Sequence, residues 1–461
     1  MSAQANNSKR LTRYPSGSFK ELLFLALPLV LSTLSANMLN ICDRYFLSLY
    51  SQSAWKAVTA ATNITYFLQI VFVMIALVSQ GFIGYFKGSN QEKKIGPFVW
   101  QMIYFSIFSM IITYPLGVAG EYYLKGIESQ QGAILYLRYL SAANFLFPLG
   151  STLSAFYLGR GKTQLILCTN IVLQAINVGL DYILIFGYKP ILSPMGIKGA
   201  ALATIVSQAL FCTILFISFA QKKYKIIYST NNKNLNIDML FECLKAGLPR
   251  ALGRCTVIGS WVLGSYFLIQ RGGDYFLVYS FGVTIFTFTS FFMDGISQAL
   301  VTLASYNLGK TSEEILQKNL KNALLLLSFV LLILFIPLIL LKKTTISIFV
   351  KSTPSSYATL QLEYCCIWLW ISSFCSGINR IGMSFITASR DTVFYAVFVF
   401  GLWFTFSLPI YIGVNLFACT PVIIFICDSF NSLFNGIIFM IRFLKSPYKK
   451  IERISEYAAT N

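Results

Sequence analysis

The chain has 461 residues, of which 56% are hydrophobic and only 11% are charged, and its mean hydropathy is +0.66. Soluble domains carry about 25% charged and about 45–50% apolar residues, so this composition excludes a soluble globular protein. The formal charge is +19, but the basic residues are scattered along polar connections between apolar segments. This distribution indicates positive-inside topology and attraction to anionic lipid rather than nucleic-acid binding.

Apolar runs of about 20 residues recur along the chain, and each is long enough to cross about 30 Å of hydrocarbon as a helix. The strands of a membrane barrel would give shorter, alternating signals. We therefore predict an all-α polytopic membrane protein with twelve transmembrane helices. The expected spans are Leu22–Leu47, Val58–Tyr85, Ile95–Val118, Ala133–Leu158, Thr163–Phe186, Ile197–Ala220, Met239–Gln270, Tyr275–Leu308, Leu320–Leu341, Ser355–Ser389, Thr392–Val414 and Thr420–Phe443.

The basic residues also predict the orientation of the chain. With both termini in the cytoplasm, Lys and Arg on the inner connections clearly outnumber those on the outer ones, as the positive-inside rule requires. Residues 1–18 are polar and the first apolar run is long enough to span, so no cleavable signal peptide is expected. We expect a multi-pass integral protein of the plasma membrane, the inner membrane in a bacterium.

The longest polar connection divides the chain nearly in half, and short similarities link the two halves. Ala26-Leu27-Pro28 resembles Gly247-Leu248-Pro249, which lies 221 residues later. Six spans in each half is an even number, so two repeated halves would be related by an axis along the membrane normal. The expected divisions are a cytoplasmic tail at 1–21, a first lobe at 22–221, a cytoplasmic linker at 222–238, a second lobe at 239–443 and a cytoplasmic tail at 444–461.

One helix face in the fifth span carries polar residues at membrane depth. Gln174, Asn177 and Asp181 lie at i, i+3 and i+7, so two amides and a carboxylate share one face. A carboxylate in the membrane is costly and usually faces the bundle interior or a water-filled cavity. We interpret this face as half of an ion or proton site, although a hydrogen-bond network that only holds helices together is the alternative. In the first span Asn40 and Asp43, at i and i+3, present a second amide and acid.

Several motifs in order along the chain resemble the multidrug and toxic compound extrusion (MATE) family, within the wider superfamily of flippases and exporters. The motifs are Leu25-Ala26-Leu27-Pro28, Cys42-Asp43-Arg44-Tyr45-Phe46, Asn177-x-x-x-Asp181, Gly199-Ala200-Ala201-Leu202-Ala203-Thr204, and the loop sequences Leu158-Gly159-Arg160-Gly161-Lys162-Thr163 and Asn307-Leu308-Gly309-Lys310. This resemblance implies two six-helix lobes around a central cavity and export of a substrate driven by Na⁺ or H⁺.

The resemblance also implies a cation or proton site in the first lobe, formed by Asp43, Asn177, Asp181 and Thr204. Carboxylate, amide and hydroxyl oxygens suit a small desolvated cation such as Na⁺, and two neighbouring acids can instead share a proton. Asn40 and Gln174 are expected to support these ligands. Pro28 removes a helix hydrogen bond, and the resemblance implies that its helix bends when the site is protonated. Arg44 departs from the family pattern; we expect it to extend to the outer interface, where it could still neutralise Asp43.

The second half carries a different set of charges from the one that the resemblance implies. These residues are Arg250, Arg254, Asp294, Arg380 and Asp428. Ionisable residues within a membrane generally pair, so the favoured interpretation is a structural or gating network, with substrate recognition as the alternative.

The favoured function is a secondary active antiporter that exports amphipathic or cationic small molecules in exchange for Na⁺ or H⁺ by alternating access. The alternative within the superfamily is a flippase for a lipid-linked sugar or another lipid, and the third is a membrane receptor or scaffold that transports nothing. An enzyme is not expected, because histidine is absent, no nucleophile–base pair is evident and no G-x-x-x-x-G-K-[ST] sequence occurs. The expected partners are a small-molecule substrate and the lipid bilayer, with no nucleic acid and no cofactor beyond the coupling ion, and we expect a monomer.

Overall fold

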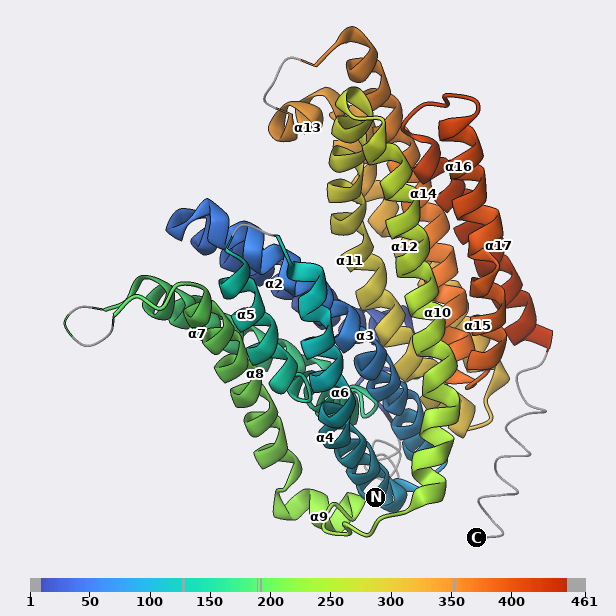
Figure 1. Cartoon of the computed structure of the whole chain (residues 1–461). Helices are drawn as coiled ribbons and strands as arrows, with labels where there is room; N and C mark the ends of the chain where they lie inside the picture. The colour runs from blue at the N-terminus through green and yellow to red at the C-terminus, as the bar shows by residue number, and fades with distance from the viewer. Residues whose placement is uncertain (1–9, 127–128, 189, 191–192, 351–353, 446–461) are drawn as a thin grey trace. The chain divides into compact units, whose positions relative to one another are not determined.

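The computed structural model describes residues 10–126, 129–188, 190, 193–350 and 354–445, and this part of the chain is helical almost throughout (Figure 1). The elements are α2 (Phe19–Tyr50), α3 (Gln52–Gly88), η1 (Glu92–Lys94), α4 (Ile95–Gly120), η2 (Glu121–Leu124), α5 (Gln130–Ala142), α6 (Leu146–Leu158), α7 (Thr163–Phe186), α8 (Ile197–Phe219), α9 (Lys222–Tyr228), α10 (Ile237–Gln270), α11 (Gly273–Gly309), α12 (Glu313–Phe335), η3 (Ile336–Leu340), α13 (Lys342–Phe349), α14 (Ser356–Ala388), α15 (Thr392–Phe400), η4 (Trp403–Ser407), α16 (Leu408–Asn415) and α17 (Ile423–Lys445).

Ten helical segments in the described residues are long and apolar enough to cross a membrane. The remaining two predicted spans are also helical: Ser355–Ser389 corresponds to α14, and Ala133–Leu158 corresponds to α5 and α6 together. The prediction of an all-α, multi-pass membrane protein is therefore confirmed.

The fourth predicted span is not one continuous helix, which corrects its sequence-based description. The helix stops after Ala142 and resumes at Leu146. Pro148 lies just beyond the break and has no backbone N–H to donate to the carbonyl of Asn144, four residues earlier. Asn144 itself is buried, so its amide stays inside the bundle at the break.

The ninth and eleventh predicted spans are also irregular. Each contains a π-helical turn, Ile336–Leu340 in one and Trp403–Ser407 in the other. Pro337 and Pro409 lie within or directly after these turns, and a proline in a helix displaces the regular hydrogen-bond ladder.

The predicted linker, 222–238, contains a short helix that its polar composition did not indicate. In α9, Tyr224 and Tyr228 lie on one face, and both pack edge-on against Phe156 of α6, with ring centroids 5.6 and 5.7 Å from it. The guanidinium of Arg160, which is 2% exposed, lies 4.2–4.5 Å from the same three rings. Aromatic and cation–π contacts therefore hold this helix in place.

The helices of the two halves correspond closely. Helix α3 and helix α11 each have 37 residues, and α11 begins 221 residues after α3. This is the same separation as that between Pro28 and Pro249. The constant separation supports the interpretation of the chain as two repeated halves.

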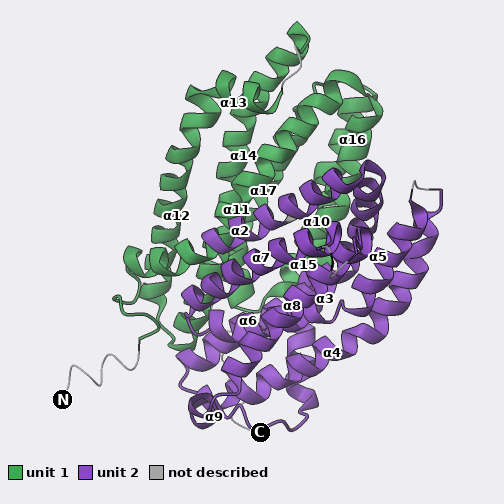
Figure 2. Ribbon diagram, turned by 90° about the vertical axis from the view of Figure 1, so that its left-hand side faces the viewer, with its two compact units in different colours: residues 1–30, 252–461 green, residues 31–251 purple. Residues whose placement is uncertain are grey.

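The described chain forms two compact units (Figure 2). Unit 1 comprises Met1–Val30 with Leu252–Asn461, and unit 2 comprises Leu31–Ala251. The chain passes from one unit to the other inside α2 and inside α10, in each case two residues beyond a proline, Pro28 or Pro249. The predicted lobes divide at the linker, 222–238, and not inside these helices, so the predicted division of the chain stays a prediction. Most of the predicted C-terminal tail, 444–461, lies outside the described residues.

Candidate functional site

The carboxyl groups of Asp43 in α2 and Asp181 in α7 meet inside unit 2. They lie within hydrogen-bonding reach of each other, although 138 residues separate them in sequence. Asp181 is 1% exposed and Asn177, one turn before it, is 2% exposed, whereas Asp43 is half-buried. The structure therefore brings close together the two acids that the family resemblance assigned to one site.

The oxygen atoms of this cluster lack hydrogen-bond donors. Both carboxylate oxygens of Asp181, Oδ1 of Asp43 and Oδ1 of Asn177 are buried, and no described residue donates a hydrogen bond to them. Buried polar groups in folded proteins are almost always hydrogen-bonded, and an unpaired buried carboxylate is especially costly. Two close carboxylates repel each other unless a proton or a cation lies between them. The arrangement therefore fits a proton shared by the two acids, or a small cation such as Na⁺ on three of the four predicted ligands.

One further residue borders the acids and was not identified from the sequence. Tyr136 of α5 is 7% exposed, lies within electrostatic reach of Asp43 and Asp181, and hydrogen-bonds with Thr62 of α3. Its hydroxyl gives the cluster a polar neighbour from a third helix. Tyr136 is one of 26 tyrosines, and no spacing distinguishes it from those in the core or at the membrane interface.

The predicted supporting role of Gln174 agrees with its contacts. Its carboxamide contacts the hydroxyl of Ser35 in α2, and in the orientation that satisfies both amide atoms its oxygen accepts the backbone N–H of Ala36 at 3.1 Å. One turn earlier, Asn170 donates to the hydroxyl of Ser32. Polar contacts therefore join α7 to α2 along the face that ends at Asp181. Ser32, Ser35 and Asn170 carry no charge, so nothing in the sequence distinguished them from other polar residues in the spans.

The other first-half predictions have different outcomes. Thr204 of α8 is half-buried and donates its hydroxyl proton to the carbonyl of Ala200 in its own helix, at 3.1 Å, so its role as a fourth ligand stays a prediction. Asn40 lies in α2, but its side chain is outside the described part of the structure. Helix α2 continues through Pro28, and bending there also stays a prediction. Arg44 is exposed, as expected, and lies within electrostatic reach of Asp43.

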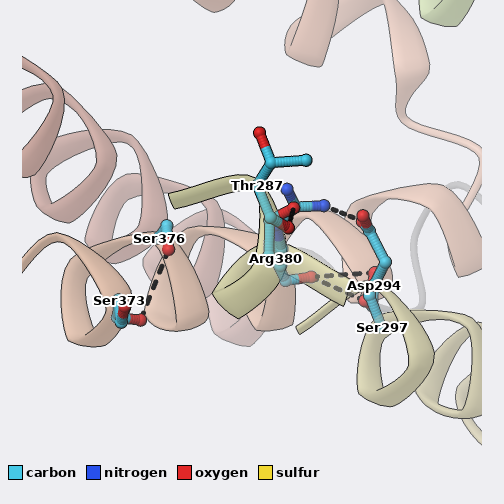
Figure 3. Close-up of polar contacts among 8 residues, drawn as sticks. Thr287, Asp294, Ser297, Ser373, Ser376 and Arg380 are labelled. Carbon is cyan, nitrogen blue, oxygen red and sulfur yellow. Dashed lines mark hydrogen bonds and ion pairs between the residues drawn. The ribbon is translucent and has the colours of Figure 1, made fainter. Parts of the chain in front are cut away.

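In unit 1, four of the predicted charges lie close together, and Figure 3 shows the two that form an ion pair. Arg380 of α14 makes an ion pair with Asp294 of α11. Asp428 of α17 is 8% exposed and lies within electrostatic reach of Arg380, as does Arg254 of α10. Ser297, one turn after Asp294, contacts the hydroxyl of Ser384 at 2.7 Å and lies beside the backbone carbonyl of Arg380. Arg380 therefore has two acidic neighbours, Asp294 and Asp428.

Further buried polar residues follow Asp428 along α17. Asn431 donates to the carbonyl of Thr405 at 2.7 Å and accepts from the Thr405 hydroxyl at 2.5 Å, while Asn435 is 6% exposed. The polar stripe of Asp428, Asn431 and Asn435 therefore faces the interior of the unit. Arg250, the remaining member of the predicted set, belongs to unit 2 and is half-buried there.

Removing one member of the Arg380–Asp294 pair is expected to destabilise the protein, and removing both is expected to restore most of the loss. The side chains are 21% and 36% exposed, so the cost of Arg380→Gln or Asp294→Asn should be roughly 1–3 kcal/mol, between the values for exposed and buried pairs. The Tm values of the wild type, the two single variants and the double variant, measured by thermal unfolding in detergent, test this expectation. Single variants with wild-type Tm but weakened binding of a cationic dye would contradict the structural role and favour substrate recognition.

Comparisons with known proteins agree with this geometry. The MatE family model matches residues 28–183, which include both acids. A probable multidrug resistance protein NorM from Thermotoga maritima is 23% identical over 301 residues, 64% of each chain, so the match spans less than two thirds of that relative. A probable NorM from Pasteurella multocida is 22% identical over 435 residues, 86% of this chain and 92% of that protein. A crystal structure of MATE in the straight conformation matches with a TM-score of 0.81 at 15% identity, covering 96% of this chain and 97% of the other.

The fold is therefore that of an all-helical, multi-pass integral membrane protein, with Asp43 and the buried Asp181 close together inside one of its units. The chain resembles the MATE family in its sequence motifs, in the family model that matches residues 28–183 and in its fold. These comparisons agree with the resemblance drawn from the sequence.

Proposed function

We propose that this protein is a secondary active antiporter that exports amphipathic or cationic small molecules in exchange for Na⁺ or H⁺. The observation that carries this proposal is the Asp43–Asp181 contact, in which Oδ1 of Asp43 and both carboxylate oxygens of Asp181 are buried without hydrogen-bond donors among the described residues. Such a pair holds a negative charge that only a proton or a cation can offset. The names of the relatives, which describe multidrug resistance proteins, support the substrate class.

The coupling follows from the contacts of α2 and α7. With a proton or Na⁺ bound, the two carboxyls attract a common positive charge and the helices that carry them are held together. When the ion leaves, repulsion between the carboxylates favours separation of α2 from α7 at this point. A ligand that binds one of these two arrangements more tightly is then coupled to the ion by a free energy that acts in both directions. Alternating access uses this coupling to exchange ion for substrate.

The orientation is proposed from the positions of the basic residues. Lys222, Lys223 and Lys225 lie in or beside α9 between the two halves, and exposed lysines are retained preferentially on the cytoplasmic side. An even number of spans then places both termini in the cytoplasm. We propose the plasma membrane, or the inner membrane in a bacterium, as the location and a monomer as the working form.

A lipid flippase is the less favoured function. A pyrophosphate headgroup would require arginines whose charge is available in the second half. Arg380 is instead paired with Asp294 and has Asp428 nearby, so much of its charge is already neutralised. The Nε of Arg254 is buried and has no hydrogen-bond acceptor among the described residues. Loss of lipid translocation in Arg254→Gln, without loss of dye efflux, would favour the flippase.

The decisive experiment is efflux of the cationic dye ethidium from proteoliposomes under separately imposed Na⁺ and pH gradients. We expect at least one gradient to drive efflux and an ionophore that dissipates this gradient to stop it. Equal dye movement with and without either gradient would contradict antiport.

A further inference from the structure

One carboxamide in α4 holds the segment that leads into α10. Gln101 is 0% exposed; its Nε2 donates to the carbonyl of Asn234 at 2.8 Å, and its Oε1 accepts the backbone N–H of Asn236 at 3.0 Å. Asn236 immediately precedes α10, which begins at Ile237. Gln101 therefore pairs with two backbone groups just before α10, and one of them is the N–H of Asn236, which the start of the helix leaves without an intrahelical partner.

Neighbouring residues of α4 complete this attachment. The indole of Trp100 donates to the carbonyl of Thr230 at 2.8 Å, and the hydroxyl of Tyr104 donates to the carbonyl of Lys233 at 2.8 Å. A side-chain carbon at Gly96 would lie 2.4 Å from the carbonyl oxygen of Tyr228, so the two backbones touch there. The whole segment from 228 to 236 is thus attached to α4.

A second carboxamide does the same for the segment that leads into α2. Asn322 of α12 donates to the carbonyl of Gly17 at 2.8 Å. Gly17 has φ +76°, and a side-chain carbon there would lie 3.0 Å from Ile315 of α12. The Gly17 N–H donates to Glu21 at 2.8 Å, and Glu21 is 1% exposed. The chain just before α2, which begins at Phe19, is therefore attached to α12.

The two carboxamides occupy equivalent positions in the two halves. Asn322 follows Gln101 by 221 residues, the separation found for Pro28 and Pro249 and for the starts of α3 and α11. The spans that carry them, Glu92–Leu124 and Glu313–Leu340, also begin 221 residues apart. Each carboxamide holds the segment that enters the other half: Gln101 holds the entry to α10, and Asn322 holds the entry to α2.

These two attachments determine where α2 and α10 are anchored. The entry to α2 is bonded within unit 1 and the rest of α2 beyond Val30 belongs to unit 2. The entry to α10 is bonded within unit 2 and the rest of α10 beyond Ala251 belongs to unit 1. Each helix changes unit two residues past its proline, where the hydrogen-bond ladder is already interrupted.

We propose that Gln101 and Asn322 are paired positioning residues of the transport cycle. Each fixes the start of one proline-containing helix, so that structural change is taken up inside α2 and α10 and not by release of their entry segments. The role in the cycle rests on the proposed antiport function, whereas the attachment of the segments does not.

The test combines hydrogen exchange with transport, using Gln101→Leu and Asn322→Leu. The exposed carboxamides Gln164 and Gln317 provide the matched controls Gln164→Leu and Gln317→Leu. Each Leu variant loses one to two buried hydrogen bonds. The rate of backbone amide hydrogen exchange should therefore rise about tenfold, in residues 230–236 for Gln101→Leu and in residues 10–18 for Asn322→Leu. Neither variant should affect the other segment. Asn322→Gln keeps the donor and should behave as the wild type.

In proteoliposomes each Leu variant should lower the maximal rate of ethidium efflux severalfold, with an unchanged half-saturating ethidium concentration. Unchanged amide exchange in both segments would show that Gln101 and Asn322 do not hold them. Faster exchange with wild-type efflux would show that these attachments have no role in the transport cycle. Absence of efflux from the wild-type protein would overturn antiport and the role together, while the exchange measurement would still decide the attachment.

Discussion

Asp181→Asn is expected to abolish ion-driven efflux while leaving the protein as stable as the wild type, or more stable. The asparagine has the same shape but can neither exchange a proton nor carry the charge that attracts Na⁺. Because interactions with a charged group are worth about 1.5–3 kcal/mol, we expect driven efflux of ethidium to fall about ten- to hundredfold. The carboxylate oxygens of Asp181 have no donors in the described structure, so removing their charge also removes an unfavourable buried group.

The combination of lost transport and retained Tm separates a coupling site from a structural one. A hydrogen-bond network that only holds α2 and α7 together would lose stability when Asp181 is changed, and transport would fall in proportion. Asp43→Asn should resemble Asp181→Asn. Asp238→Asn provides the control, because Asp238 is exposed in the first turn of α10. Wild-type coupled efflux in both site variants would refute the proposed site.

Gly199→Ala is expected to have the largest effect on folding near the site. A side-chain carbon at Gly199 of α8 would lie 2.4 Å from the carbonyl oxygen of Leu184 and 2.9 Å from the backbone N of Ile185, both in α7. These are backbone atoms that cannot rotate away, so α7 and α8 must separate. Overpacking of this kind costs roughly 1–3 kcal/mol, and here the displaced helix is the one that carries Asp181. We expect a lower Tm and reduced ethidium efflux.

Gly179→Ala is the matched control for this prediction. Gly179 lies in α7 itself, two residues before Asp181, but no atom lies within 4 Å of the place where its side-chain carbon would be. Alanine is favoured over glycine in a helix by about 1 kcal/mol, so this variant should be neutral or slightly stabilising. A similar loss of Tm in both variants would show that helix contact at Gly199 is not the cause.

Much of the fold could be predicted because its signals are local. An apolar run of about 20 residues predicts a membrane helix without knowledge of its neighbours, and most of the twelve spans are found where hydropathy placed them. The two departures have different causes. Pro148 lies just beyond a break in a run that hydropathy treats as one span. Helix α9 forms in a polar segment because Tyr224 and Tyr228 pack against Phe156 and Arg160, which lie more than 60 residues earlier in the chain.

The acids of the candidate site could be nominated from sequence because a charge at membrane depth is conspicuous. Tyr136 and Thr62 could not, because a tyrosine or threonine costs little in a membrane helix, so such residues occur at many positions. Thr204 was nominated by the family motif and not by its charge; its hydroxyl donates within its own helix, and its role as a ligand stays a prediction.

The sequence by itself determined that this is a helical membrane protein with acids in its first and fifth spans, since composition and helical periodicity follow from covalent order alone. Only the tertiary structure decided that Asp43 and Asp181 meet and that Arg380 pairs with Asp294. It also decided that Gln101 holds the segment before α10 and that Asn322 holds the segment before α2. The physical reason is that hydrogen bonds and ion pairs depend on distances of about 3 Å between groups far apart in the chain, which helix packing sets.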